Sequence, residues 1–390
     1  MDKIAVVGLG KAGLPIAAVI ADSGLEVTGV DIDEKRCRMI NSGQNPIPEE
    51  RGLGKLISIY GGNKLTAVSD FKLAGNCKAF IIIVPLFIDK NNQPDFSILL
   101  DAVGRVGQIL KEDDVVILET TVPPLTTETM IRDALEKESN LEIGDFYLAN
   151  SPERIMTGYS ISRLTEFPKI IGGVNKESGE KAYEVYSKFI PNLYKVSSAR
   201  LAEFVKVIEG CYRDVNIALS NELLKIAEEI GVNIQEAIDT AKHEYCHLHQ
   251  PSTGVGGHCI PVYPWFLIKE MERREKSEKA KLLRTAREMN DEMADYWVNK
   301  IVSECTKIDK PLRNIKICVK GITFREGVKE LYHSRNLEIV RRLMAKDLDV
   351  SVYDEMFTPD EIEQMGFKYC SEEVEVDIIL DGFKPDIIKR

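Results

Sequence analysis

The chain begins with a glycine-rich strand–turn–helix pattern, and no other feature constrains its fold as strongly. Residues 3–24 read KIAVVGLGKAGLPIAAVIADSG, an apolar run followed by Gly8, Gly10 and Gly13 and then a helical pattern. These glycines suit a tight turn, close approach of a pyrophosphate to backbone N–H groups, and close helix–strand packing. Asp31 ends the next apolar stretch, where a carboxylate accepts hydrogen bonds from a ribose. The pattern favours dinucleotide binding over an ordinary glycine turn, and NAD over NADP, because a carboxylate repels a 2′-phosphate.

Apolar strands and helical patterns then alternate over the first 195 residues. Residues 77–85, 114–120 and 146–150 have the composition of buried parallel strands, and residues 96–110 that of an amphipathic helix. We therefore expect an α/β fold with an N-terminal Rossmann-type domain at 1–195.

Polar residues follow the ends of these strands. They are Pro85, Thr120, Thr121, Glu153 and Arg154. In open α/β sheets ligands bind at this edge, so each is a candidate site residue, with turn and capping chemistry as the alternative interpretation.

A long helical pattern covers 199–230 and ends before Gly231. Such a helix is roughly 45 Å long, which suits a link between domains and a dimer surface, within a central region at 196–305. Lys206 lies beside the apolar stripe, either as a surface lysine with a packed stem or as an ammonium directed at a site. The stripe comprises Leu201, Phe204, Ile208, Tyr212, Val215, Leu219 and Leu223.

The C-terminal part repeats the design of the N-terminus. A charged stretch at 269–302 is predicted to form a solvated helical pair, and 315–324 is again a strand followed by glycine. Further strands are expected at 349–355 and 376–383. We expect a smaller Rossmann-like domain at 306–390, so that two nucleotide-type domains flank a helical centre.

One cysteine stands in a rigid turn. Cys259 lies within GVGGHCIPVYP, residues 254–264, between glycines and prolines. A thiol placed in this way suits a nucleophile, and a tight turn holding a small apolar residue is the alternative.

Composition narrows the possible partners. The chain has 51 basic and 62 acidic residues, a net charge of -11, which argues against a nucleic-acid surface. No apolar run approaches the roughly 20 residues of a membrane span, and the first strand leaves no room for a signal peptide. Eight cysteines without framework spacing are typical of reduced thiols. We expect a cytoplasmic protein without membrane or nucleic-acid partners.

A cluster of histidines resembles a zinc-ligand set. It contains His243, Cys246, His247 and His249. The spacing fits no regular zinc finger, and zinc on Cys259 would quench the nucleophile, so no metal is expected.

At this point the chain resembles the nucleotide-sugar 6-dehydrogenases, the family that acts on UDP-glucose and UDP-N-acetylmannosamine. The matching motifs occur in the family's order over nearly the whole chain. The segments YRDVNIA and GGHCI…PWF resemble the N-acetylhexosamine branch more than the UDP-glucose branch. The motifs are GLGKAGLP, VP at 84–85, ETTVPP, SPERI, AEFVKVIEG.YRDVNIALSNE, GVGGHCIPV.PW, AREMND and GITFRE.

The resemblance implies a four-electron oxidation. The C6 hydroxymethyl group of a UDP-sugar becomes a carboxylate in two hydride transfers to NAD⁺, with UDP-N-acetyl-D-mannosamine as the expected substrate. The glucose, galactose and N-acetylglucosamine nucleotides are alternatives. Cys259 matches the nucleophile that forms a thiohemiacetal and then a thioester. Lys206 matches the group that stabilises oxyanion charge, Glu153 the group that activates water or transfers a proton, and Thr121 a residue that holds the water.

Binding residues are implied in the same way, together with a homodimer through the 199–230 helix and a role in polysaccharide synthesis. The implied cofactor residues are Gly8, Gly10, Gly13, Asp31, Lys35, Pro85, Thr121 and Arg325. The implied substrate residues are Arg154, Lys206, Gly254, Gly256, Gly257, His258 and Phe324.

The chain departs from the family pattern near the nucleophile. Gly210 replaces an asparagine, and Tyr263 replaces an aspartate. We hypothesise that Tyr263 or a water occupies the space vacated at Gly210. Tyr332 stands where the family has an arginine, which Arg335 is a candidate to replace.

Two other functions remain open on the sequence alone. One is a hydroxyacid dehydrogenase that performs a single two-electron oxidation, and the placed cysteine argues against it. The other is a non-catalytic protein that binds NAD or a UDP-sugar, supported only by the departures from the family pattern.

Overall fold

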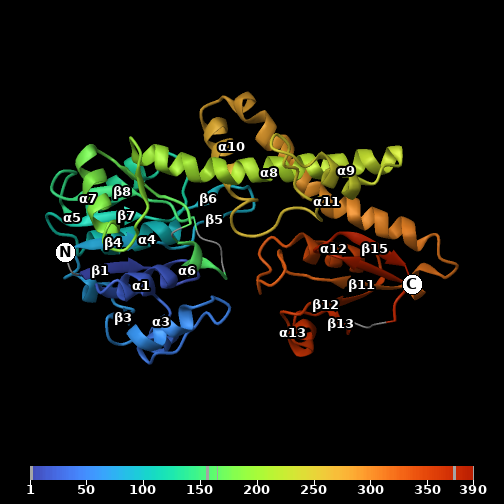
Figure 1. The fold of residues 1–390 in the computed structure, drawn as a ribbon, viewed down its shortest axis with the longest axis horizontal. Coiled ribbons are helices and arrows are strands. Elements are labelled where there is room, and N and C mark those ends of the chain that lie inside the picture. The colour runs from blue at the N-terminus through green and yellow to red at the C-terminus, as the bar shows by residue number, and fades with distance from the viewer. Residues whose placement is uncertain (1–2, 155–157, 165, 372–374, 390) are drawn as a thin grey trace. The chain divides into compact units, whose positions relative to one another are not determined.

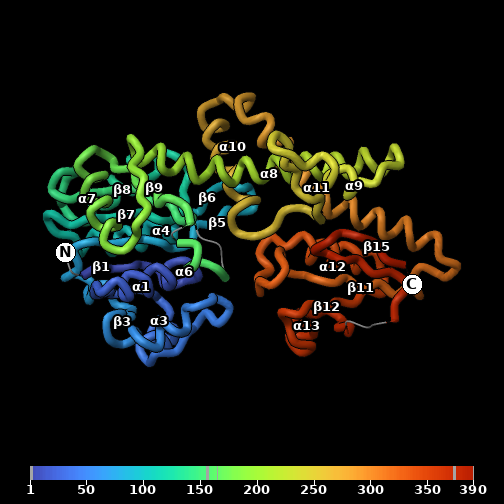
Figure 2. Tube along the Cα trace, viewed as in Figure 1, coloured from blue at the N-terminus to red at the C-terminus, as the bar shows by residue number. Residues whose placement is uncertain are grey.

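A computed structural model of the chain describes residues 3–154, 158–164, 166–371 and 375–389. The chain forms two compact units, Met1–Ile208 and Glu209–Arg390, which can be followed by colour along the ribbon and the tube (Figure 1, Figure 2). The division into three domains, with boundaries at 195 and 305, stays a prediction.

The first unit is built on an eight-stranded sheet in the order β10-β9-β8-β7-β4-β1-β2-β3. Six neighbouring strands of this sheet, β8-β7-β4-β1-β2-β3, are parallel and follow the order of a dinucleotide-binding fold. Strand β9 runs antiparallel to β8. The strands are β1 Lys3–Val7, β2 Glu26–Val30, β3 Leu65–Val68, β4 Ala79–Ile82, β7 Val115–Leu118, β8 Tyr147–Asn150, β9 Lys169–Gly173 and β10 Leu193–Lys195, with a separate hairpin of β5 Phe87–Ile88 and β6 Pro94–Asp95.

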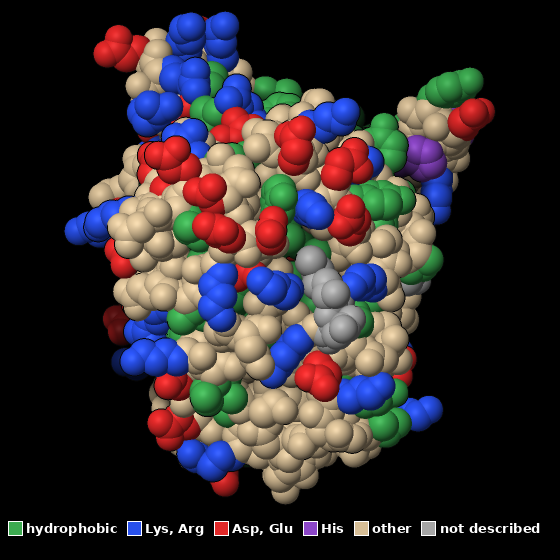
Figure 3. All heavy atoms as spheres, turned by 90° about the vertical axis from the view of Figure 1, so that its left-hand side faces the viewer, with side chains coloured by type: hydrophobic (Ala, Val, Ile, Leu, Met, Phe, Trp, Pro, Cys, Tyr) green, Lys and Arg blue, Asp and Glu red, His purple; other side chains and the backbone are tan. Residues whose placement is uncertain are grey.

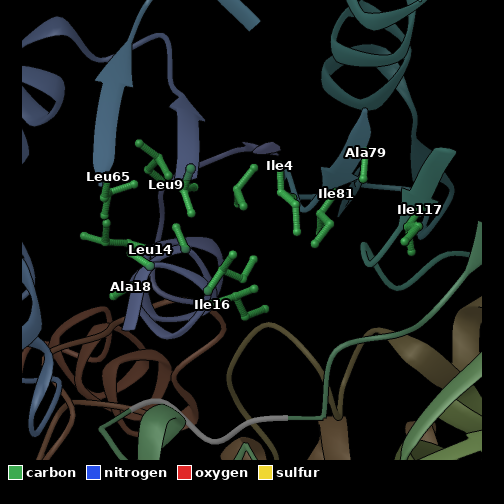
Figure 4. Packing of buried hydrophobic residues seen from close by; sticks show 14 of the residues in the cluster. Ile4, Leu9, Leu14, Ile16, Ala18, Leu65, Ala79, Ile81 and Ile117 are labelled. Atoms are coloured by element: carbon green, nitrogen blue, oxygen red, sulfur yellow. The ribbon is translucent and has the colours of Figure 1, made fainter. Parts of the chain in front are cut away.

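Helices cover both faces of this sheet. On one face α1, α3 and α7 pack over alternate strand residues, and Figure 4 shows Leu14 of α1 near Leu9 and Leu65. On the other face α4 and α5 cover residues such as Phe80. Burial on two faces explains the nearly continuous apolar strands. The helices are α1 Gly13–Asp22, α2 Glu34–Asn41, α3 Leu53–Tyr60, α4 Ser97–Gly107, α5 Arg132–Ser139, α6 Ser160–Arg163, α7 Lys176–Tyr186 and α8 Ala199–Ile230.

The second unit contains a five-stranded sheet in the order β13-β12-β11-β14-β15, in which only the β14–β15 pair is antiparallel. Its strands are β11 Lys316–Lys320, β12 Asp349–Tyr353, β13 Lys368–Tyr369, β14 Ile378–Asp381 and β15 Asp386–Lys389. Its helices are α9 Ile234–Ala241, α10 Tyr263–Arg273, α11 Lys281–Cys305, α12 Arg335–Met344 and α13 Pro359–Gln364.

The predicted α/β organisation is confirmed at the level of single elements. Strands β4, β7, β8, β11, β12 and β14 fall within the predicted apolar runs, and α8 has the predicted bounds. The prediction of a solvated helical pair at 269–302 is wrong for α11. One face of α11 is buried against the second core, with Trp297 1% and Met293 0% exposed, because apolar residues recur at helical spacing between its charges.

Acidic and basic side chains alternate on the surface of the first unit. Figure 3 shows them interspersed on that face, with scattered apolar groups between them. Among the described residues, no helix has the length and hydropathy that crossing a membrane requires.

Candidate active site

The glycine turn of the first unit has the geometry that its sequence predicts. Gly8 has a φ of +96°, and a Cβ on Gly13 would lie 1.9 Å from the carbonyl oxygen of Gly8, so neither position accepts a side chain. A Cβ on Gly10 would meet nothing within 4 Å. The turn is therefore closed on its packing side and open where a pyrophosphate would lie, so these residues fit a dinucleotide.

Asp31 lies at the end of β2, beside this turn. Its Oδ2 accepts a hydrogen bond of 2.8 Å from the N–H of Leu9 and one of 2.9 Å from Nη1 of Arg36. Arg36 was not among the predicted residues, whereas the predicted Lys35 is exposed. The contact of Arg36 with Asp31 has no signal in the motif, because it depends on how α2 follows β2.

Three parallel strands bring the other predicted residues of this unit to one sheet edge. Pro85 follows β4, Thr121 follows β7, and Glu153 and Arg154 follow β8. Thr121 is half-buried, and Arg154 donates from Nη1 to the carbonyl oxygen of Pro168 at 3.0 Å. Residues 155–157, which continue the SPERI loop, lie outside the described residues.

Glu203 attaches α8 to the loop that follows β7. Its carboxylate accepts hydrogen bonds from the N–H groups of Leu125 and Thr127, both at 2.7 Å, and from the Thr127 hydroxyl at 2.6 Å. Burial raises the pKa of Glu203 to about 7, although these donors oppose the shift. The predicted residue Lys206 follows one turn later on α8 and is half-buried.

Sequence reasoning missed a buried ionic group at this edge. Lys169 Nζ lies 2.8 Å from Glu119 Oε2 and 3.6 Å from Glu153 Oε2, and the Tyr186 hydroxyl donates to Glu119. The signal available in the sequence was an ionisable residue at one boundary of each of two apolar strands. Glu119 directly follows β7, and Lys169 is the first residue of β9.

In the second unit, Cys259 lies in the turn before α10. Its carbonyl oxygen accepts the N–H groups of Val262 at 3.1 Å and Tyr263 at 3.0 Å, and the residue is exposed. All eight cysteines of the chain are free thiols. The Cys259 thiol is thus accessible on a backbone that the start of a helix holds in place.

The glycines before Cys259 have a packing role. A Cβ on Gly257 would lie 2.8 Å from the ring of Phe324, and one on Gly256 would lie 2.6 Å from the carbonyl oxygen of His333. Gly257 donates its N–H to the carbonyl oxygen of Tyr332 at 2.9 Å, and Gly254 donates to Ser252 Oγ at 3.2 Å. These glycines allow the loop to contact the 324–335 segment closely, and their contact with a substrate stays a prediction.

The other predicted residues of this unit lie in the 324–335 segment or contact it. The ring of His258 stacks on that of Tyr332, with centroids 4.1 Å apart and planes at 6°, and its Nε2 lies 3.3 Å from Glu330. The guanidinium of Arg325 lies 5.8 Å from the ring centre of Phe324.

Arg335 does not have the free guanidinium that a replacement for the family arginine would need. It pairs with Asp291 and with Glu338, the latter at 2.7 Å, and donates to the carbonyl oxygen of Val255 at 3.2 Å. Arg335 therefore anchors residues 254–259, which we call the cysteine loop, to α11 and α12.

The hypothesis that Tyr263 occupies the space vacated at Gly210 is confirmed. A Cβ on Gly210 would lie 2.6 Å from Tyr263 Cδ2, and Tyr263 is 8% exposed. The two replacements are therefore coupled, because the ring fills the volume that a larger residue at 210 would need.

The histidine cluster forms a local turn, in which the N–H of His243 and of Cys246 each donate to the other's carbonyl oxygen. No group of three or more His, Cys, Asp or Glu side chains in the described part of the chain is arranged to hold a metal ion.

Comparisons with known proteins cover both units. Residues 2–190 match the NAD binding domain of the UDP-glucose/GDP-mannose dehydrogenase family, and residues 200–292 match the central domain of that family. The chain is 40% identical over 361 residues to the UDP-N-acetyl-D-mannosamine dehydrogenase of Methanococcus vannielii, a match that covers 91% of this chain and 80% of the relative.

Two further relatives agree with this result. The NDP-N-acetyl-D-galactosaminuronic acid dehydrogenase of Ralstonia nicotianae is 36% identical over 88% of this chain and 81% of its own. The solved structure of the UDP-D-ManNAc dehydrogenase from Pyrococcus horikoshii is 32% identical and superposes with a TM-score of 0.90 over 98% of this chain and 89% of its own.

Proposed function

This chain belongs to the UDP-glucose/GDP-mannose dehydrogenase family and carries its NAD binding domain, and on that premise we propose that it oxidises the C6 hydroxymethyl group of a UDP-sugar to a carboxylate. The observation that carries the proposal is the exposed thiol of Cys259, held before α10, in a chain that also has an open dinucleotide turn. Bound NAD⁺ supplies the hydride acceptor for both oxidations.

The residues of this chain have defined roles in the proposed reaction. After the alcohol becomes an aldehyde, the Cys259 thiolate adds to its carbonyl carbon and forms a thiohemiacetal. Loss of a hydride and of the hydroxyl proton gives a thioester, and water releases the carboxylate and the free thiol. Lys206 stabilises the oxyanions, whereas Glu153 takes a proton from the water that Thr121 holds.

We propose UDP-N-acetyl-D-mannosamine as the preferred substrate. The support is the similarity to relatives of that name, at 40% identity for Methanococcus vannielii. The N-acetyl-D-galactosaminuronic acid relative is close in identity, so the sugar epimer needs a direct comparison. The cytoplasmic location stays a prediction.

The test is the number of NADH molecules formed per UDP-sugar. Wild type is expected to form two with one preferred sugar among the N-acetylmannosamine, N-acetylglucosamine, glucose and galactose nucleotides. Cys259→Ser should lose the second oxidation or all turnover, whereas Cys246→Ser, a matched change at a half-buried cysteine of the same unit, should not. One NADH, unchanged in Cys259→Ser, would indicate a single-step dehydrogenase, and no NADH with any sugar a non-catalytic binding protein.

We also propose a homodimer through α8. Six apolar residues on one stripe of this helix are between 37% and 65% exposed, an arrangement that suits burial against a second copy. Tyr212→Glu should shift the chain from dimer to monomer in light scattering, whereas Arg213→Glu, on a different side of the helix, should not. The residues are Leu201, Phe204, Ile208, Tyr212, Leu219 and Ile226.

A further inference from the structure

An ammonium lies between two carboxylates in the interior of the first unit. Lys169 is 2.8 Å from Glu119 and 3.6 Å from Glu153, and its side chain is 5% exposed. The side chain of Glu119 is 0% and that of Glu153 13% exposed. Charges at such depth have lost most of their hydration, so pairing with an opposite charge offsets part of the cost of burial.

Backbone contacts hold these three groups in place. The N–H of Glu153 donates to the carbonyl oxygen of Glu119 at 3.2 Å, which joins the loop after β8 to the end of β7. Ser151 Oγ donates to the carbonyl oxygen of Ile170 at 2.7 Å, which joins the same loop to β9 and hence to Lys169. The ammonium is thus fixed between the carboxylates by the sheet itself.

The buried aromatic residue Tyr186 completes the group from α7. It is 1% exposed, its hydroxyl donates to Glu119, and Lys169 Nζ lies 5.3 Å from its ring centre. The pKa of Glu119 is raised to about 7, chiefly by burial, with Lys169 opposing the shift and Glu153 adding to it. The charge of Glu153 therefore disfavours the ionised form of Glu119, whereas the charge of Lys169 favours it.

Two arginines lie near the same group. Arg154 and Arg163 line a small hollow with Glu153 and Lys169. Arg154 donates to Pro168, and Arg163 pairs with Glu166 at 3.4 Å. Lys169 pairs with Glu153 as well as with Glu119.

We propose that Lys169 is a positioning residue for the oxidation: lying between Glu119 and Glu153, it keeps the Glu153 carboxylate ionised and oriented toward the proton that Glu153 accepts, while Glu119 and Tyr186 hold the lysine. This inference rests on the proposed function, because Lys169 acts through the role of Glu153. It adds Lys169, Glu119 and Tyr186 to the residues on which the reaction depends.

The pH profile of kcat separates this role from a structural one. In Lys169→Met the two carboxylates lose the ammonium that lies between them, so the midpoint of the acid limb of this profile should move up by about one pH unit or more. At pH values below the limb the loss of kcat should be about tenfold, and it should be regained at higher pH. Glu119→Gln removes the competing carboxylate and should move the limb down. Lys169→Arg should stay close to wild type.

The matched control is Lys78→Met. Lys78 pairs with Asp114 at 2.8 Å at the start of β4 and β7, the opposite edge of the same sheet, so its loss should leave the limb unmoved. If Lys169→Met lowers kcat by one factor at every pH, or if Glu119→Gln moves the limb in the same direction, the proposal is wrong. Should Lys169→Met fail to fold, the sign of the Glu119→Gln shift still decides.

A second readout needs no turnover. The infrared carboxyl band of Glu153, identified by its loss in Glu153→Gln, should titrate at higher pH in Lys169→Met than in wild type. If wild type forms no NADH from any UDP-sugar, the proposed function fails while this band still tests the link between Lys169 and Glu153. If NADH forms and the band does not shift, the inference alone is overturned.

Discussion

The two units contain the same glycine turn, used in two ways. Gly8 and Gly321 each follow the first strand of a parallel pair with a positive φ, +96° and +80°. In each unit the next N–H donates at 2.8 Å to an aspartate at the end of the neighbouring strand, Leu9 to Asp31 and Ile322 to Asp354. The local chemistry of the two turns is therefore the same.

The connection from each turn to the next helix differs between the units. In the first unit α1 begins at Gly13, and the turn stays open at Gly10. In the second unit α12 begins only at Arg335, and the intervening segment packs on Gly256 and Gly257 of the cysteine loop. One turn leaves its backbone open at Gly10, where we propose that a dinucleotide binds, whereas the other leads into the segment that packs against the loop of Cys259. The same turn therefore acquires its role from the length of the connection to the next helix.

The largest expected effect is at the closed side of the first turn. Gly13→Ala places a Cβ 1.9 Å from the carbonyl oxygen of Gly8, so it should lower the free energy of unfolding by about 3 kcal/mol. Gly10→Ala meets nothing within 4 Å and should leave stability within about 0.5 kcal/mol, yet weaken NADH binding about tenfold. Denaturant unfolding and NADH fluorescence measure the two effects. Equal stability losses in both variants would contradict the assignment of an open side.

The next effect is in the cysteine loop. Gly257→Ala combines a φ of +93° with a contact of 2.8 Å to the Phe324 ring, and should cost about 2 kcal/mol together with most of the activity. Gly327→Ala is the matched control, since its φ is +71° and its surroundings are open. It should lose about 1 kcal/mol and keep the activity. Equal kcat values for the two variants would mean that the packing of the cysteine loop does not matter for catalysis.

A smaller effect is expected when the aspartates that accept hydrogen bonds from the two turns, Asp31 and Asp354, are replaced. Asp354→Asn weakens hydrogen bonds to Ile322 and Thr323, and should cost about 1 kcal/mol of stability without changing NADH affinity. Asp31→Asn should cost a similar amount and also weaken NADH binding. Denaturation and NADH titration of both variants test this difference. Loss of NADH binding in Asp354→Asn alone would reverse the roles given to the two turns.

The smallest effect concerns the pH dependence of stability that buried carboxyl groups cause in the two units. Burial raises the pKa of Glu119 from its usual 4.5 to about 7, and burial also raises that of Asp214, against the opposing charge of Arg287. The folded chain then binds more protons than the unfolded chain between these values, so stability falls as pH rises from about 4.5 to about 7. Glu119→Gln should flatten this slope by no more than about 1 kcal/mol per pH unit. Unfolding at several pH values tests it, with exposed Glu112→Gln as the control, and an unchanged slope in Glu119→Gln would contradict it.

Much of the fold and part of the site could be predicted from the sequence. The glycine turns, the apolar strands and the bounds of α8 depend on backbone sterics and on hydrophobic periodicity over a few neighbouring residues. For that reason the open position at Gly10, the aspartate at 31 and the rigid turn at Cys259 were predicted from short segments. The link between Gly210 and Tyr263 was also predicted, because both departures fell in one set of motifs.

Only the tertiary structure decided which distant residues meet. Lys169 and Glu119 are 50 positions apart in the numbering, and Tyr186 follows 17 positions after Lys169, so no spacing rule joins them. They meet because β9 lies antiparallel to β8, which places its first residue at the end of β7 and β8, and because α7 covers that edge. Likewise, the sequence indicated that Gly256 and Gly257 allow a close approach of the backbone to a ligand, but their packing against Phe324 and His333 required the fold. Local sterics determine turns and strands, whereas sheet order and register determine which side chains share a buried site.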